Sequence, residues 1–193
     1  MTATEPRKFR LDHARRVAEW FSQALSPFVE RIEIVGSIRR RRPGVKDIEL
    51  LFIPKFRLKA ADLFSLKASE MTDCADNAIN TMLTQGIIDR RVNKLDRVTW
   101  GKENKLAVHV ESGIPVDFFA TTQDKWWNSL VVRTGGKKTN VTIAQLALKK
   151  GWSLEAYGTG FRKLDGGQHY QTTSEEDVFK FVGLACLAPP QRP

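Results

Sequence analysis

The chain has 193 residues, of which 41% are hydrophobic and 27% are charged, as in an ordinary globular protein with a sizeable core. Its 31 basic residues outnumber its 22 acidic residues, and the net charge of +9 attracts polyanions, of which nucleic acid is the commonest. The sequence has neither an apolar run long enough to span a membrane nor the apolar core of a signal peptide. These features argue against membrane and secreted proteins, and they predict a cytoplasmic protein with a polyanionic partner.

The cysteines and histidines are too few and too scattered for several kinds of site. Cys74 and Cys186 have neither metal-ligand spacing nor a disulfide framework around them. The three histidines, His13, His109 and His169, are far apart in the sequence, so neither a zinc site nor a histidine-based catalytic triad is supported.

Hydrophobic periodicity predicts a mixture of helices and strands in the first part of the chain. We expect helices over 14–28 and 73–85, and strands over 31–35, 47–53, 87–99, 105–110 and 114–121. The strand at 87–99 contains a polar break, and the last two strands form a hairpin around Glu111-Ser112-Gly113.

Two acids stand in the strand predicted over 47–53, which is otherwise too apolar for the surface. Because side chains alternate along a strand, Asp47 and Glu49 share a face, with Cα atoms roughly 6.5–7 Å apart. Two carboxylates in an apolar setting repel one another unless cations lie between them. A pair of Mg²⁺ ions about 3.5–4 Å apart satisfies such a site, because these hard cations take carboxylate oxygens.

The loop before this strand carries groups that suit a phosphate. Gly36-Ser37 allows backbone N–H groups and a hydroxyl to approach phosphate oxygens, and Arg39 and Arg40 can clamp them. Taken singly, each feature is more often a turn, a solvated basic face or an edge-strand acid. Their order in one strand–loop–strand unit favours nucleotidyl transfer instead.

A third acid, Asp117, stands between Val116 and Phe118 in the strand predicted over 114–121. One alternative is an edge-strand acid. A third metal ligand on a strand next to Asp47 and Glu49 is preferred, because it completes a carboxylate triad.

The second half of the chain has a more helical character. We expect helices over 124–134, 139–150 and 178–186, and a hairpin with strands at 161–164 and 168–171. Ser174-Glu175-Glu176-Asp177 resembles a capping box that opens the last helix.

These motifs resemble those of the family X DNA polymerases, the DNA polymerase beta family, whose signature is G-S-x-R-R followed by D-x-D on the next strand. The hairpin around Asp117, Thr134-Gly135-Gly136 and 174–184 also resemble this family, so the likeness spans roughly residues 12–192. The resemblance implies an α+β fold. It divides the chain into a nucleotidyltransferase palm over 1–122, with a mixed sheet and flanking helices, and a small α+β thumb-like subdomain for nucleotide selection over 123–193.

The resemblance also implies site residues. Asp47, Glu49 and Asp117 correspond to the acids that hold two divalent metals, Mg²⁺ with Mn²⁺ as a possible substitute. The nucleotide-binding residues implied are Gly36, Ser37 and Arg40 at the β- and γ-phosphates, Gly135 at the sugar, and Asn140 at the minor-groove edge of the base. For Thr134-Gly135-Gly136, a plain helix-ending turn is an equally good interpretation.

The sequence departs from the family at several positions. Glu49 replaces an Asp, Pro115 replaces a basic residue two before the third acid, and Val132-Arg133 replaces aromatic residues that exclude a ribose 2′-OH. Ala144 replaces a basic residue aimed at the template. The family's N-terminal lyase and DNA-gripping domains are expected to be absent, as in its minimal viral members, and a bacterial source also fits.

The expected function is DNA-directed addition of dNMP to a primer 3′-OH with release of pyrophosphate, of the gap-filling repair type. The expected partners are dNTP and primer-template or gapped DNA, with no membrane, and the expected state is a monomer. The alternatives are template-independent addition, a small-molecule nucleotidyltransferase and a non-catalytic nucleic-acid-binding relative. Glu49 favours the last of these, and the charge of +9 argues against the small-molecule enzyme.

Overall fold

The structure, a computed structural model, describes residues 7–58, 71–93 and 95–193. Its helices and strands follow in the order β1 (Phe9–Arg10), α1 (Leu11–Leu25), η1 (Ser26–Phe28), β2 (Val29–Ile34), α2 (Gly36–Arg39), β3 (Gly44–Val45), β4 (Ile48–Pro54), β5 (Phe56–Leu58), β6 (Met71–Asp73), α3 (Cys74–Thr84), β7 (Ile88–Arg90), β8 (Asn104–His109), β9 (Pro115–Ala120), α4 (Trp126–Thr134), α5 (Lys137–Lys149), β10 (Trp152–Leu154), β11 (Gly160–Lys163), β12 (His169–Gln171), α6 (Glu175–Val182) and η2 (Pro189–Gln191).

A five-stranded sheet of order β2-β4-β9-β8-β7 forms the centre of the larger part. The pairing of β4 with β9 is parallel and the other pairings are antiparallel, so the sheet is mixed. This confirms the predicted α+β fold class with a mixed sheet and flanking helices.

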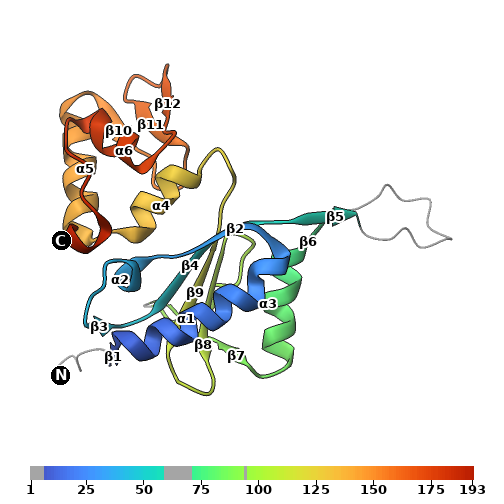
Figure 1. Ribbon diagram of the computed structural model, residues 1–193. Helices are drawn as coiled ribbons and strands as arrows, with labels where there is room; N and C mark the ends of the chain where they lie inside the picture. Colours follow the sequence, from blue (N-terminus) through green and yellow to red (C-terminus); the bar gives the residue numbers. More distant parts are fainter. Residues whose placement is uncertain (1–6, 59–70, 94) are drawn as a thin grey trace, which may run out of the picture.

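Helices α1 and α3 cover one face of this sheet and lie in front of it in Figure 1. Alternation along the strands turns Leu50, Phe52 and Phe118 toward these helices. In α1 the buried residues Ala14, Ala18, Phe21 and Leu25 recur at helical spacing and form the facing stripe. The opposite face of the sheet is thereby left for the acids and for α4.

Helix α4 contributes to two hydrophobic cores. Leu130 packs with Leu51 and Phe119 on the acid-bearing face of the sheet. The next residue, Val131, packs in a separate core with Ile143, Ala147, Phe161, Val178, Phe179 and Val182. The C-terminal elements around this second core gather at the upper left of Figure 1. A single short helix therefore joins the sheet to the C-terminal core.

Several sequence predictions are corrected in detail. The loop at Gly36-Ser37, which was expected to bind phosphate, begins with the one-turn helix α2. The strand predicted over 47–53 begins at Ile48, so Asp47 precedes it. Of the strand predicted over 87–99, only β7 is regular, followed by an isolated bridge between Val92 and Val98. The last helix ends at Val182, because Gly183 adopts a left-handed conformation that stops it.

The two-stranded ribbon of β5 and β6, which the sequence did not indicate, projects away from the sheet (Figure 1). In the described ranges, no helix has the length and apolar character needed to cross a membrane.

Candidate active site

The turn into α2 lies directly against the carboxylate of Glu49. Gly36 has φ +63°, a left-handed conformation that favours glycine. A Cβ added to Gly36 would overlap Oε2 of Glu49 and lie 2.7 Å from its Cδ. The backbone N–H of Val35 also donates to the carbonyl of Glu49 at 2.9 Å. Both the backbone conformation and the glutamate beside it therefore require glycine at position 36.

The parallel pairing of β4 with β9 sets Glu49 directly beside Asp117. Asp47 lies two residues before Glu49, just ahead of β4, and its charge acts on both of the other acids. The structure thus brings the three predicted acids to one region of the sheet.

Burial of these carboxyls disfavours their charged forms. Burial, with Asp47 and Asp117 adding to it, raises the pKa of Glu49 to about 8. Burial also raises the pKa of Asp117 to about 6, although the adjacent Arg91 opposes the shift. A bound cation would offset this penalty, which is why such a cluster is a candidate metal site.

The acids are nevertheless not arranged as a ready-made set of ligands. Within residues 7–58, 71–93 and 95–193, no three His, Cys, Asp or Glu side chains converge closely enough to hold one metal ion. Nη2 of Arg91 donates to Oδ1 of Asp117 at 2.5 Å, and the carboxylate of Glu49 lies against Gly36. The ligand atoms that these residues offer are all carboxylate oxygens, which is the type of ligand that Mg²⁺ prefers.

Polar atoms without partners lie in three of the predicted nucleotide-binding residues. Ser37 Oγ, Arg40 Nε and Asn140 Oδ1 are buried and have no hydrogen-bond partner in the described part of the chain. Buried polar groups are normally paired, so such atoms indicate a missing ligand or water. Arg40 and Gly135 are brought together: Nη1 of Arg40 donates to the carbonyl of Thr134 and lies 3.0 Å from where a Cβ of Gly135 would be. Asn140 Nδ2 is already engaged by the carbonyl of Val132 at 2.8 Å.

Comparison with known proteins identifies the C-terminal part and the fold. Residues 129–193 match the family model of the DNA polymerase beta thumb. The chain is also similar to the solved structure of polymerase beta from Leishmania infantum in a ternary P/T complex, with a TM-score of 0.70 and 17% sequence identity over 97% of this chain and 77% of that one. The fold of the chain is therefore polymerase beta-like. The predicted resemblance to family X is thereby confirmed. No curated protein matches the chain in sequence.

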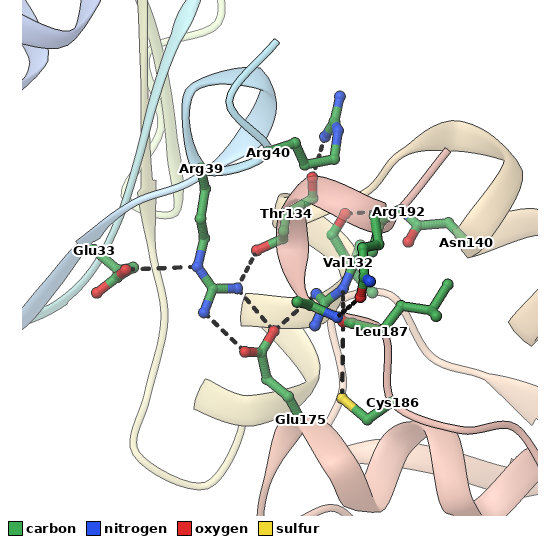
Figure 2. Close-up of polar contacts among 12 residues, drawn as sticks. Glu33, Arg39, Arg40, Val132, Thr134, Asn140, Glu175, Cys186, Leu187 and Arg192 are labelled. Atoms are coloured by element: carbon green, nitrogen blue, oxygen red, sulfur yellow. Dashed lines mark hydrogen bonds and ion pairs between the residues drawn. The ribbon is translucent and has the colours of Figure 1, made fainter.

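An ion-pair network joins the part of the chain that matches the thumb to helix α2 on the sheet side, as Figure 2 shows. Arg39 donates to both carboxylate oxygens of Glu175 at 2.8 Å and to Oγ1 of Thr134 at 2.7 Å. Arg192, which is almost fully buried, donates to the same Glu175 at 2.9 Å. Burial by itself would raise the pKa of Glu175, but the hydrogen bonds from Arg39 and Arg192 outweigh it and lower the pKa.

Sequence reasoning missed two arginines of this region. Arg39 was expected to clamp phosphate oxygens beside Arg40, but here it is held by Glu175. Arg91 is one of the basic residues that, from the excess of positive charge, we expect on a DNA-binding surface, but in the structure it contacts Asp117. The sequence signal for Arg91 is indirect: Pro115 stands where the family resemblance predicts a basic residue near the third acid.

We predict that Gly36→Ala destabilises the protein by more than the roughly 1–2 kcal/mol of a left-handed alanine, because the new methyl group also overlaps Glu49. Chemical denaturation measures this loss. The double variant Gly36→Ala/Glu49→Asp should recover part of it, since the shorter side chain withdraws from the glycine. If the double variant loses as much free energy of unfolding as the two single variants lose together, the contact between position 36 and Glu49 does not explain the glycine.

We also predict that the metal-free protein becomes less stable as pH rises from about 4.5 to 8. In this window folded Glu49 keeps a proton that the unfolded chain has lost, so the free energy of unfolding falls with rising pH. Asp117, with its pKa raised to about 6, contributes in the same direction at lower pH. Denaturant titrations in EDTA across this range measure the slope. Glu49→Gln should flatten it, whereas the control Glu19→Gln, on the exposed side of α1, should not.

Proposed function

We propose that this protein adds dNMP to the 3′-OH of a DNA primer and releases pyrophosphate, as a gap-filling polymerase of the repair type. The observation that carries the proposal is the in-register pairing of Glu49 with Asp117, with Asp47 beside them. The match of residues 129–193 to a polymerase thumb supports the proposed role of the C-terminal part in nucleotide selection. We take residues 1–122 as the catalytic palm and 123–193 as the thumb-like subdomain.

In this proposal Asp47, Glu49 and Asp117 hold two Mg²⁺ ions. When bound, such ions lower the pKa of the primer hydroxyl and neutralise the triphosphate and the leaving pyrophosphate. The protein itself supplies the carboxylates, packs α4 against the same face of the sheet, and positions the nucleotide. Glutamate is one methylene longer than aspartate, but its carboxylate reaches the same face from position 49.

The nucleotide is held by donors from both halves of the chain. Ser37 Oγ and the Arg40 guanidinium bind oxygens of the β- and γ-phosphates, and the backbone at Gly135 passes close to the sugar. The unpartnered atoms Ser37 Oγ, Arg40 Nε and Asn140 Oδ1 support this assignment, because a nucleotide would satisfy them. Asn140 then meets the minor-groove edge of the base with its free oxygen.

One observation favours a second candidate, a non-catalytic nucleic-acid-binding relative. Among the described residues the acids do not form a converged metal-ligand group, and Arg91 occupies one oxygen of Asp117. The two candidates differ in a single measurable property, which is nucleotide transfer in the presence of Mg²⁺ or Mn²⁺.

We predict primer extension on a labelled gapped duplex with Mg²⁺ or Mn²⁺ and dNTPs, and loss of extension to background in Asp47→Ala and Asp117→Ala. Each substitution removes a proposed metal ligand while leaving the basic surface that binds DNA. Asp89→Ala, an exposed acid on β7, is the matched control and should extend normally. The same assay with a single-stranded primer separates templated from untemplated addition. Wild-type protein that binds DNA without extending any primer would establish the non-catalytic candidate.

We further predict that duplex binding depends steeply on salt. Roughly four to seven phosphate contacts give a slope of log K against log salt of about 0.9 per contact. The residues expected to supply these contacts are basic side chains of the described part of the chain, among them Lys55, Arg57, Lys102, Lys137 and Lys138. Sequence preference should be slight, since phosphate contacts carry no base information. A titration from low to physiological salt measures the slope, and a flat response would point to a small-molecule nucleotidyltransferase.

A further inference from the structure

Arg91 is the one described basic residue whose side chain is bonded to an acid of the proposed metal site. It follows β7, and its backbone N–H donates to the carbonyl of Leu106 at 3.0 Å. Leu106 pairs with Asp117 across β8 and β9. Arg91 therefore lies one strand away from Asp117, and its side chain crosses β8 to reach the carboxylate.

In the described part of the chain, the side chain of Arg91 has one hydrogen-bonded partner. Its only hydrogen bond runs from Nη2 to Asp117 Oδ1 at 2.5 Å, and its Nε is buried without a partner. The side chain is 30% exposed and that of Asp117 is 12% exposed, so the pair is shielded from much of the solvent. The hydrogen bond to Asp117 therefore explains why this shielded guanidinium lies where it does.

We propose that Arg91 is a positioning residue for Asp117: it holds one carboxylate oxygen and leaves the other for a divalent cation. This inference rests on the proposed function, and it goes beyond it by assigning a residue outside the signature motifs. Hydrogen bonds from neighbouring groups commonly fix the orientation of a ligating carboxylate. The arrangement also has an opposing effect, because the positive charge of Arg91 repels an incoming cation.

These two effects give Arg91→Ala an unusual combination of results. Without the guanidinium the carboxylate of Asp117 is free to rotate, so turnover at saturating metal and DNA should fall about ten- to hundredfold. Without its positive charge, a cation is repelled less, so the affinity for Mn²⁺ should rise. Substitution of a merely structural residue would lower both the turnover and the Mn²⁺ affinity. Substitution of a DNA-contacting residue would change neither quantity at saturating DNA. The Km for dNTP should stay unchanged, because the affected step is the chemistry at Asp117.

The matched control is Arg90→Ala. Arg90 is the neighbouring residue with the same charge, but its guanidinium lies over the ring of Trp100 at 5.1 Å, away from Asp117. It should keep wild-type turnover at saturating DNA and wild-type Mn²⁺ affinity. Arg91→Lys keeps the charge and one donor, so it should recover part of the turnover while Mn²⁺ affinity stays close to wild type. Arg91→Met, which keeps the apolar stem, repeats the test if the alanine variant fails to fold.

The experiment combines two independent readouts on the full chain. Mn²⁺ binding is titrated by electron paramagnetic resonance in the absence of DNA and dNTP, and turnover is measured by primer extension. Higher Mn²⁺ affinity with lower turnover in Arg91→Ala supports the proposal. Equal turnover in Arg91→Ala and Arg90→Ala, or an Mn²⁺ affinity that does not rise, overturns it. Absence of extension by the wild type overturns the proposed function instead, and the Mn²⁺ comparison still tests Arg91.

Discussion

Mutual repulsion among three carboxylates on one face of a sheet is the constraint around which this site is built. Parallel pairing of β4 with β9 fixes Glu49 beside Asp117, and neither can move away without breaking the ladder. Nearby positive charges partly offset this repulsion. Arg133 and Arg40 act to lower the pKa of Glu49, and Arg91 donates a hydrogen bond to Asp117. Even so, burial dominates and both pKa values remain raised. The site is thus poised to gain free energy when a divalent cation enters.

The same constraint explains why the thumb must be held near the sheet. Arg133, from the end of α4, stacks on the ring of Phe119 at 3.6 Å and lies 5.3 Å from that of Tyr157. Its charge therefore reaches the acids only while α4 lies over the sheet face. Arg39 and Glu175 link the same two parts from the side of α2. The electrostatic effect of Arg133 on Glu49 consequently depends on the position of this one short helix.

Much of this arrangement could be predicted from the sequence because it follows local rules. Alternation along β4 places Glu49 on the face opposite Leu50, and an acid between apolar neighbours marks Asp117. The contacts made by Arg91 and Arg39 could not be predicted, because they depend on which strands and helices become neighbours in space. Arg91 reaches Asp117 across an intervening strand, and Arg39 meets Glu175, 136 residues later. No periodicity encodes such pairings.

Position 49 shows how a departure from a family pattern can be absorbed locally. The additional methylene of glutamate carries its carboxylate against the backbone at position 36, where any side chain would collide with it. A glycine that suits close approach to a phosphate is therefore also the residue that makes room for the longer acid. The two positions restrict each other, so that the turn at Gly36 and the acid-bearing strand β4 cannot vary independently in this chain. Glu49 and Gly36 are, on this argument, fitted to each other in the fold.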